Sequence, residues 1–123
     1  NYFIFLGKQP KSEIPKYILC ADICVDTFPD EPYFAAAAPV KLLEYGACGK
    51  PVVATAVSET KKIIIHKKYG FLAKPSDYHE YAQHIIHLLS SDKLRKKMGN
   101  DFAQHIKSEY DWKKIVQKLE DNI

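Results

Sequence analysis

The sequence predicts an α/β fold in which a doubly wound parallel sheet carries helices on both faces. Short apolar runs alternate along the chain with segments that repeat apolar residues at helical spacing. This alternation indicates βαβ units, whose right-handed crossovers place helices on both faces of a sheet. The 123 residues suffice for one domain with a core, and neither an internal repeat nor a low-complexity linker interrupts them.

The first quarter of the chain predicts a strand, a helix and a second strand. Residues 2–6 are aromatic and apolar, and Gly7 ends that run. A helix is expected to begin near Ser12, with Pro15 in its first turn, where a missing N–H costs little. Residues 23–25 form a short apolar run that predicts the next strand.

A loop, a helix and a buried strand are expected next. Residues 28–38 are rich in proline, acid and alanine and predict a loop. The helix is expected to begin at Pro39 and to continue to about residue 48. Gly49 is expected to end it in a left-handed conformation, before an apolar strand at residues 52–55.

The remaining chain predicts one strand and four helices. A short helix is expected from Ser58 or Glu59 to Ile65, and a strand at residues 70–73. Caps at Ser76-Asp77 and at Ser91 or Asp92 indicate two further helices, and a last helix is expected over residues 112–119. The expected apolar faces are Tyr81, Ile85, Leu88 and Leu89, then Leu94, Met98, Phe102, Ala103 and Ile106, then Trp112, Ile115, Val116 and Leu119.

The charges and cysteines argue against several classes of function. The net charge is only +3, and the lysine pairs are scattered, so nucleic acid is not an expected partner. A mildly basic surface is compatible with peripheral contact on the inner face of an anionic membrane, but no apolar run is long enough to span one. Cys20, Cys24 and Cys48 show no paired spacing, which favours small buried thiols in the cytoplasm.

The histidines do not indicate a metal site. His84 and His87 are three residues apart on a predicted helix, but no third ligand is evident. We therefore expect no metal and no catalytic residue in this chain.

The helix expected at residue 39 is the strongest candidate for a binding site. The N–H groups of Val40, Lys41 and Leu42 fall in its first turn, where they lack helical partners and favour an anion such as a diphosphate. Lys41 adds a positive charge, and Glu44 follows within about one turn, where a carboxylate can accept hydrogen bonds from hydroxyls. An ordinary helix start with an exposed glutamate is the alternative.

Several motifs in order suggest a family. The pattern Pro-x-Lys-x-x-Glu-Tyr, followed by Ala-Cys-Gly-Lys-Pro-Val-Val-Ala-Thr, resembles the C-terminal half of retaining GT-B glycosyltransferases, the "glycosyl transferases group 1" family. Phe-Leu-Gly-Lys at residues 5–8, Ala-Asp-Ile-x-Val at residues 21–25 and Trp112 resemble further family segments. The resemblance implies a Rossmann-like fold, with residues 1–123 forming the latter part of the nucleotide-sugar (donor) binding domain. An N-terminal acceptor domain would be absent from this chain.

The resemblance also implies roles for individual residues. Glu44 matches the second glutamate of the family's E-x7-E motif, which binds the ribose hydroxyls, and Val40 and Lys41 match positions at the diphosphate. Lys8, Gln9 and Pro10 match the loop that lies against the nucleobase. Ala36 stands where the family's first glutamate contacts the donor sugar, which is a departure from the motif.

The implied function is glycosyl transfer. The full-length enzyme would move a sugar, typically a hexose, from a nucleotide diphosphosugar to a glycan, lipid or small acceptor, with no further cofactor. Its acceptor site would lie in the N-terminal domain, so this chain alone is expected to be inactive. Two alternatives stay open: a nucleotide-sugar 2-epimerase-like enzyme, and a non-catalytic nucleotide-sugar-binding or scaffold domain, which Ala36 favours.

Overall fold

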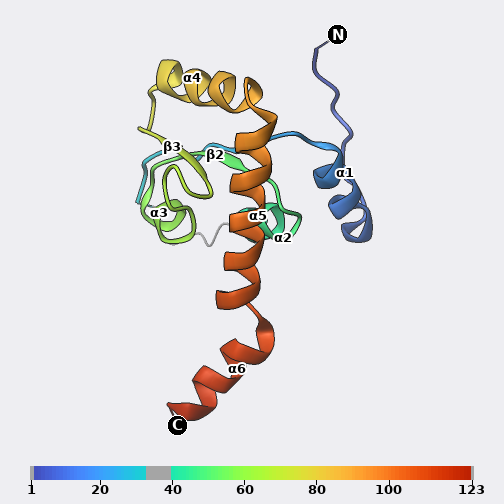
Figure 1. Ribbon diagram of the computed structural model, residues 1–123, viewed down its shortest axis with the longest axis vertical. Helices are drawn as coiled ribbons and strands as arrows, with labels where there is room; N and C mark the ends of the chain where they lie inside the picture. The colour runs from blue at the N-terminus through green and yellow to red at the C-terminus, as the bar shows by residue number, and fades with distance from the viewer. Residues whose placement is uncertain (1, 33–39, 123) are drawn as a thin grey trace.

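A three-stranded parallel sheet forms the centre of the molecule. The computed structural model describes residues 2–32 and 40–122. The strands β1 (Cys24–Asp26), β2 (Val52–Thr55) and β3 (Gly70–Ala73) lie side by side in that order, and Figure 1 labels β2 and β3 between the helices. All pairings are parallel, with Cys24 opposite Val52 and Val52 opposite Gly70. The predicted α/β class with a parallel sheet is therefore confirmed.

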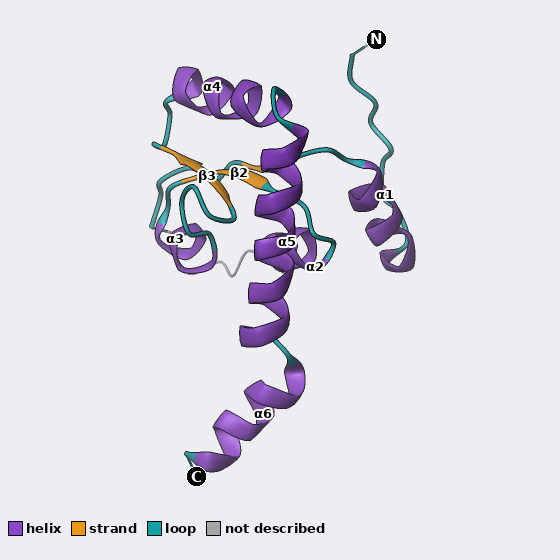
Figure 2. Ribbon diagram, in the orientation of Figure 1, coloured by secondary structure: helices purple, strands orange, loops and turns teal. Residues whose placement is uncertain are grey.

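Helices cover both faces of the sheet. In Figure 2, α4 lies on one side of the strands, α2 and α3 lie on the other, and α5 runs past both layers. The long α5 continues into α6, which extends away from the sheet. The helices are η1 (Lys11–Glu13), α1 (Ile14–Cys20), α2 (Val40–Ala47), α3 (Ser58–Ile63), α4 (Tyr78–Leu89), α5 (Asp92–Glu109) and α6 (Trp112–Asp121).

The strand alternation divides the core into two apolar clusters. Every residue of β2 is buried, and its neighbouring side chains point to opposite faces of the sheet. One cluster gathers Val52 and Ala54 with residues of α1, α2, α3 and α5, including Leu42 and Phe102. The other joins Val53 to Phe71, Leu88 and Met98. The sheet is thus packed on both faces, as a parallel sheet requires.

Glycines allow α2 and the turn after it to approach α5 closely. Gly49 follows α2 at φ +68°, which confirms the predicted left-handed helix end. A Cβ on Gly99 of α5 would lie 2.0 Å from the Gly49 carbonyl oxygen. A Cβ on Gly46 would lie 2.5 Å from Ile106 Cγ1. Both positions therefore need glycine for close packing, and this packing fixes where α2 begins relative to the sheet.

The expected strand at residues 2–6 is wrong. These residues are irregular, and Tyr2, Phe3, Ile4 and Phe5 are each at least 76% exposed. In Figure 1 the segment runs beyond α1, away from the sheet. A strand needs a neighbouring strand for its hydrogen bonds, and among the described residues this segment has none.

Smaller expectations about burial also fail. Leu89 was expected to be buried, but it is 55% exposed at the end of α4, because the buried Leu88 already faces the sheet and the next residue is turned about 100° away. Cys20 is exposed, while Cys24 is buried. The short helix ends at Ile63 instead of Ile65, and Ile64 takes an extended conformation.

Candidate functional site

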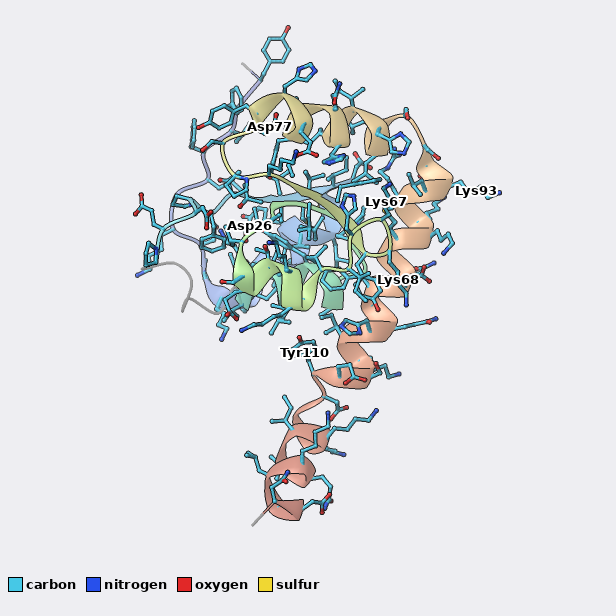
Figure 3. The ribbon with its side chains drawn as sticks, turned by 90° about the vertical axis from the view of Figure 1, so that its left-hand side faces the viewer. Asp26, Lys67, Lys68, Asp77, Lys93 and Tyr110 are labelled. Carbon is cyan, nitrogen blue, oxygen red and sulfur yellow. The ribbon has the colours of Figure 1, made fainter. Side chains whose placement is uncertain are left out.

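The carboxyl ends of the three strands meet at one edge of the sheet. Asp26 ends β1, Thr55 ends β2, and Lys74 follows β3. Ligands of open α/β sheets bind at this edge. In Figure 3, Asp26 and the Asp77 that caps α4 lie on the same side of the molecule. A binding site is therefore expected at this edge.

A buried carboxylate holds Lys41 at the start of α2. Asp26 Oδ1 lies 2.5 Å from Lys41 Nζ, and the Asp26 side chain is 0% exposed, whereas that of Lys41 is 47% exposed. The Lys41 ammonium also lies 4.9 Å from the centre of the Phe28 ring, a cation–π distance. Burial raises the pKa of Asp26, and the hydrogen bond and charge of Lys41 offset part of that rise. The pair thus joins the end of β1 to the first turn of α2.

Hydrogen bonds fix the backbone around this ion pair. Phe28 N–H donates to Thr55 Oγ1 at 2.8 Å, and the Thr55 hydroxyl donates back to Phe28 O at 2.9 Å. The Tyr81 hydroxyl donates to Val53 O at 2.8 Å and also lies 3.3 Å from Asp26 O. Burial raises the pKa of Tyr81 to about 12, so the phenol keeps its proton at neutral pH. The loop after β1 is therefore tied to β2 and to α4.

The turn after β2 has its own buried anchor. Thr60 is fully buried, and its hydroxyl lies 2.5 Å from Thr55 O and 2.9 Å from Val57 O. Val57 N–H donates to the same hydroxyl oxygen at 3.1 Å. The first turn of α3 is therefore attached to the end of β2, next to the Thr55 that holds Phe28.

A cavity of about 430 Å³ opens at the same edge of the sheet. It lies between the loop after β1 and the start of α4, and its lining is largely apolar and aromatic. The lining includes Thr27, Phe28, Thr55, Lys74, Tyr81 and Ile85.

The structure brings some of the predicted site residues together. Val40 and Lys41 occupy the first turn of α2, where N–H groups lack helical partners, and Val40 is 61% exposed. Glu44 lies one turn further and is partly exposed; among the described residues, no group donates a hydrogen bond to its carboxylate. Ala36 and Pro39 lie outside the described residues.

The loop predicted to lie against the nucleobase, residues 8–10, forms its hydrogen bonds away from the start of α2. Lys8, Gln9 and Pro10 precede η1; Gln9 Nε2 donates to Leu6 O at 2.6 Å, and Gln9 Oε1 accepts from Tyr17 OH at 3.2 Å. In the part of the chain that the structure describes, these three residues form no hydrogen bond or ion pair with α2.

Asp26, Thr55 and Tyr81 were not among the site residues predicted from the sequence. An acid at the end of an apolar strand was the available signal for Asp26, since a strand's carboxyl end in this fold points at the ligand edge. Only the fold, however, reveals that Lys41 reaches it.

Two absences among the described residues bear on other types of site. Over residues 2–32 and 40–122, no group of three or more His, Cys, Asp or Glu side chains is arranged to hold a metal ion. No helix in those ranges is long and apolar enough to cross a membrane.

The fold and its ligand edge define a Rossmann-like α/β domain, and comparison with known proteins gives its family. The family model described as glycosyl transferases group 1 matches residues 1–105. The chain therefore belongs to the glycosyl transferases group 1 family.

Known proteins resemble the chain over nearly all its length. An uncharacterised glycosyltransferase of Methanocaldococcus jannaschii is 27% identical over 118 residues, which are 96% of this chain and 29% of that protein. Sucrose-phosphate synthase of Thermosynechococcus elongatus superposes with a TM-score of 0.82 at 24% identity, over 96% of this chain and 28% of its own. HepE of Anabaena, solved in complex with UDP-glucose, superposes with a TM-score of 0.74 at 21% identity, over 89% of this chain and 29% of the HepE chain. These two structures support the fold, a partial GT-B domain, and the chain spans under a third of the length of each of these three relatives.

Proposed function

We propose that residues 1–123 are the latter part of a nucleotide-sugar-binding domain, and that the full-length protein transfers a sugar from a nucleotide diphosphosugar. The observation that carries the proposal is the start of α2, where first-turn N–H groups, the Lys41 ammonium and a Glu44 carboxylate that accepts no hydrogen bond from the described residues lie within about one turn. Membership of a glycosyltransferase family supports it, and so does the fold shared with a protein that binds UDP-glucose.

The proposed mechanism uses these groups to bind the departing diphosphate. The bond from the sugar's anomeric carbon to the diphosphate oxygen breaks, an acceptor hydroxyl oxygen forms a bond to that carbon, and the proton of that hydroxyl passes to the departing diphosphate or to water. Negative charge grows on the diphosphate as it departs, and the helix N–H groups and Lys41 stabilise that charge. Glu44 accepts hydrogen bonds from the ribose hydroxyls and orients the nucleotide. Lys8, Gln9 and Pro10 are proposed to lie against the base.

Other parts of the reaction are assigned to the rest of the protein. The acceptor and the catalytic groups are proposed to lie in an N-terminal domain, so this chain by itself should not turn over substrate. The proposal includes no metal and no cofactor besides the donor. A screen of nucleotide-sugar donors with the full-length protein identifies the hexose and the base.

Titration of the full-length protein with nucleoside diphosphates tests the proposal. Wild-type protein should bind at least one of UDP, GDP and ADP more tightly than the matching nucleoside. Glu44→Ala should weaken that binding about tenfold, the usual value of hydrogen bonds to a charged group. Glu59→Ala, which removes a partly buried carboxylate paired with Lys62 on α3, is the matched control and should bind as the wild type does.

A deoxy analogue makes the ribose assignment specific. If Glu44 binds the ribose hydroxyls, the Glu44→Ala penalty should disappear for the 2′,3′-dideoxynucleoside diphosphate. An unchanged affinity of Glu44→Ala for the normal nucleotide would exclude the ribose role. Binding without transfer or donor hydrolysis would instead favour the non-catalytic domain, and an epimerised donor as the product would favour the 2-epimerase.

A further inference from the structure

Asp26 is a fully buried carboxylate at the ligand edge of the sheet. Its side chain is 0% exposed, and burial raises its pKa. Burying a charged carboxylate is costly unless an opposite charge and hydrogen bonds compensate for the lost water. An apolar residue would pack at the end of β1 without that cost. The presence of the acid here therefore calls for an explanation beyond packing.

The contacts of Asp26 lead to Lys41. The 2.5 Å ion pair places the ammonium group at the start of α2, and the Phe28 ring lies beside it. A lysine ammonium has three N–H donors, so two remain for another acceptor while one stays on Asp26. The Lys41 side chain is 47% exposed, in contrast to the fully buried Asp26 carboxylate.

We propose that Asp26 is a positioning residue for diphosphate binding, which holds Lys41 Nζ where its remaining donors meet a phosphate oxygen. The inference rests on the proposed function of α2 as the diphosphate site. A lysine has a long, flexible side chain, and fixing it before the ligand arrives lowers the entropy lost on binding. Asp26 acts through Lys41 and does not itself touch the nucleotide.

The surroundings make Asp26 a rigid support. Its backbone carbonyl oxygen lies 3.3 Å from the Tyr81 hydroxyl. Two residues further along the chain, Phe28 is attached to Thr55 by two hydrogen bonds. The backbone that carries the carboxylate is therefore held by β2 and α4. A ligand that binds at α2 thus meets an ammonium group whose position is set by the sheet.

A double-mutant cycle in the full-length protein tests the inference. The four proteins are the wild type, Asp26→Asn, Lys41→Ala and the double variant, titrated with UDP and with uridine, which lacks the diphosphate. We expect Lys41→Ala to lower UDP affinity about tenfold, as for a charge-assisted hydrogen bond, and Asp26→Asn to lower it about threefold to tenfold. The double variant should lose no more than Lys41→Ala alone, because Asp26 acts only through Lys41.

Two controls separate positioning from a general structural effect. Uridine affinity should stay the same in all four proteins, which a distorted site would not allow. Asp101→Asn removes a carboxylate of an exposed ion pair with Lys97, 2.7 Å long, and should leave UDP affinity unchanged.

Distinct outcomes overturn the inference and the proposed function. Wild-type protein that binds neither UDP nor another nucleoside diphosphate would refute both. Wild-type binding with additive losses in the double variant would refute the positioning role alone. Tighter UDP binding by Asp26→Asn would also refute it, since the buried carboxylate would then act mainly by repelling the diphosphate.

Discussion

Replacing Thr60 by valine should destabilise the chain by about 2 kcal/mol. Valine keeps the shape of threonine but removes the hydroxyl, which accepts from Val57 N–H and donates to a carbonyl, Thr55 O at 2.5 Å or Val57 O at 2.9 Å. One proton serves one carbonyl at a time, so two buried hydrogen bonds are lost, each contributing about 1 kcal/mol. Val57 N–H retains Thr55 O as a second acceptor, which keeps the loss from being larger.

Thr60→Ser is the matched control for this prediction. Serine keeps the hydroxyl and loses one methyl group from a fully buried site, which costs about 1 kcal/mol. Urea unfolding, followed by circular dichroism, measures both variants; with a slope of about 2 kcal/mol per molar, valine should lower the midpoint by about 1 M. A valine variant at least as stable as the serine variant would refute the assigned hydrogen bonds.

Two further predictions concern packing and pH. Gly99→Ala should destabilise the chain by about 2 kcal/mol or more in urea unfolding, because the new Cβ meets the Gly49 carbonyl oxygen at 2.0 Å and the helix gains only about 1 kcal/mol from alanine; a stabilised variant would contradict this. Burial and the neighbouring His84 lower the pKa of His66, whose Nδ1 accepts from Leu72 N–H at 3.0 Å. The unfolded chain therefore takes up the proton first, and stability should fall as pH drops through about 6.5; His66→Asn should show a smaller fall, and an equal fall would refute the assignment.

The sequence predicts regular elements well where local signals and burial agree. The strands at residues 52–55 and 70–73 were predicted with their observed bounds, because each is an apolar run between turn residues. Asp77 and Ser91 cap α4 and α5 as expected, each accepting a backbone N–H three residues on. The apolar run at residues 2–6 misled the prediction, since composition does not reveal whether a neighbouring strand is available.

Less of the candidate site could be predicted. The start of α2 was located from a local pattern, but the partner of Lys41 depends on where β1 ends in space. Asp26 and Lys41 are separated in the sequence by the whole loop between β1 and α2, and no spacing rule links them. Likewise, helical spacing in the sequence predicts that Tyr81 belongs to an apolar helix face, and only the packed structure shows that its hydroxyl donates to Val53 O.

The path of α5 past both layers has a consequence for how the chain unfolds. Met98 belongs to the apolar cluster on the α4 side, whereas Phe102 and Ile106, one and two turns further on, belong to the cluster on the α2 side. A single rigid helix therefore supplies part of both cores, so neither face of the sheet can be exposed to water while the other keeps its packing. The two layers should open as one cooperative unit, and amide exchange should report similar protection in β2, α2 and α4.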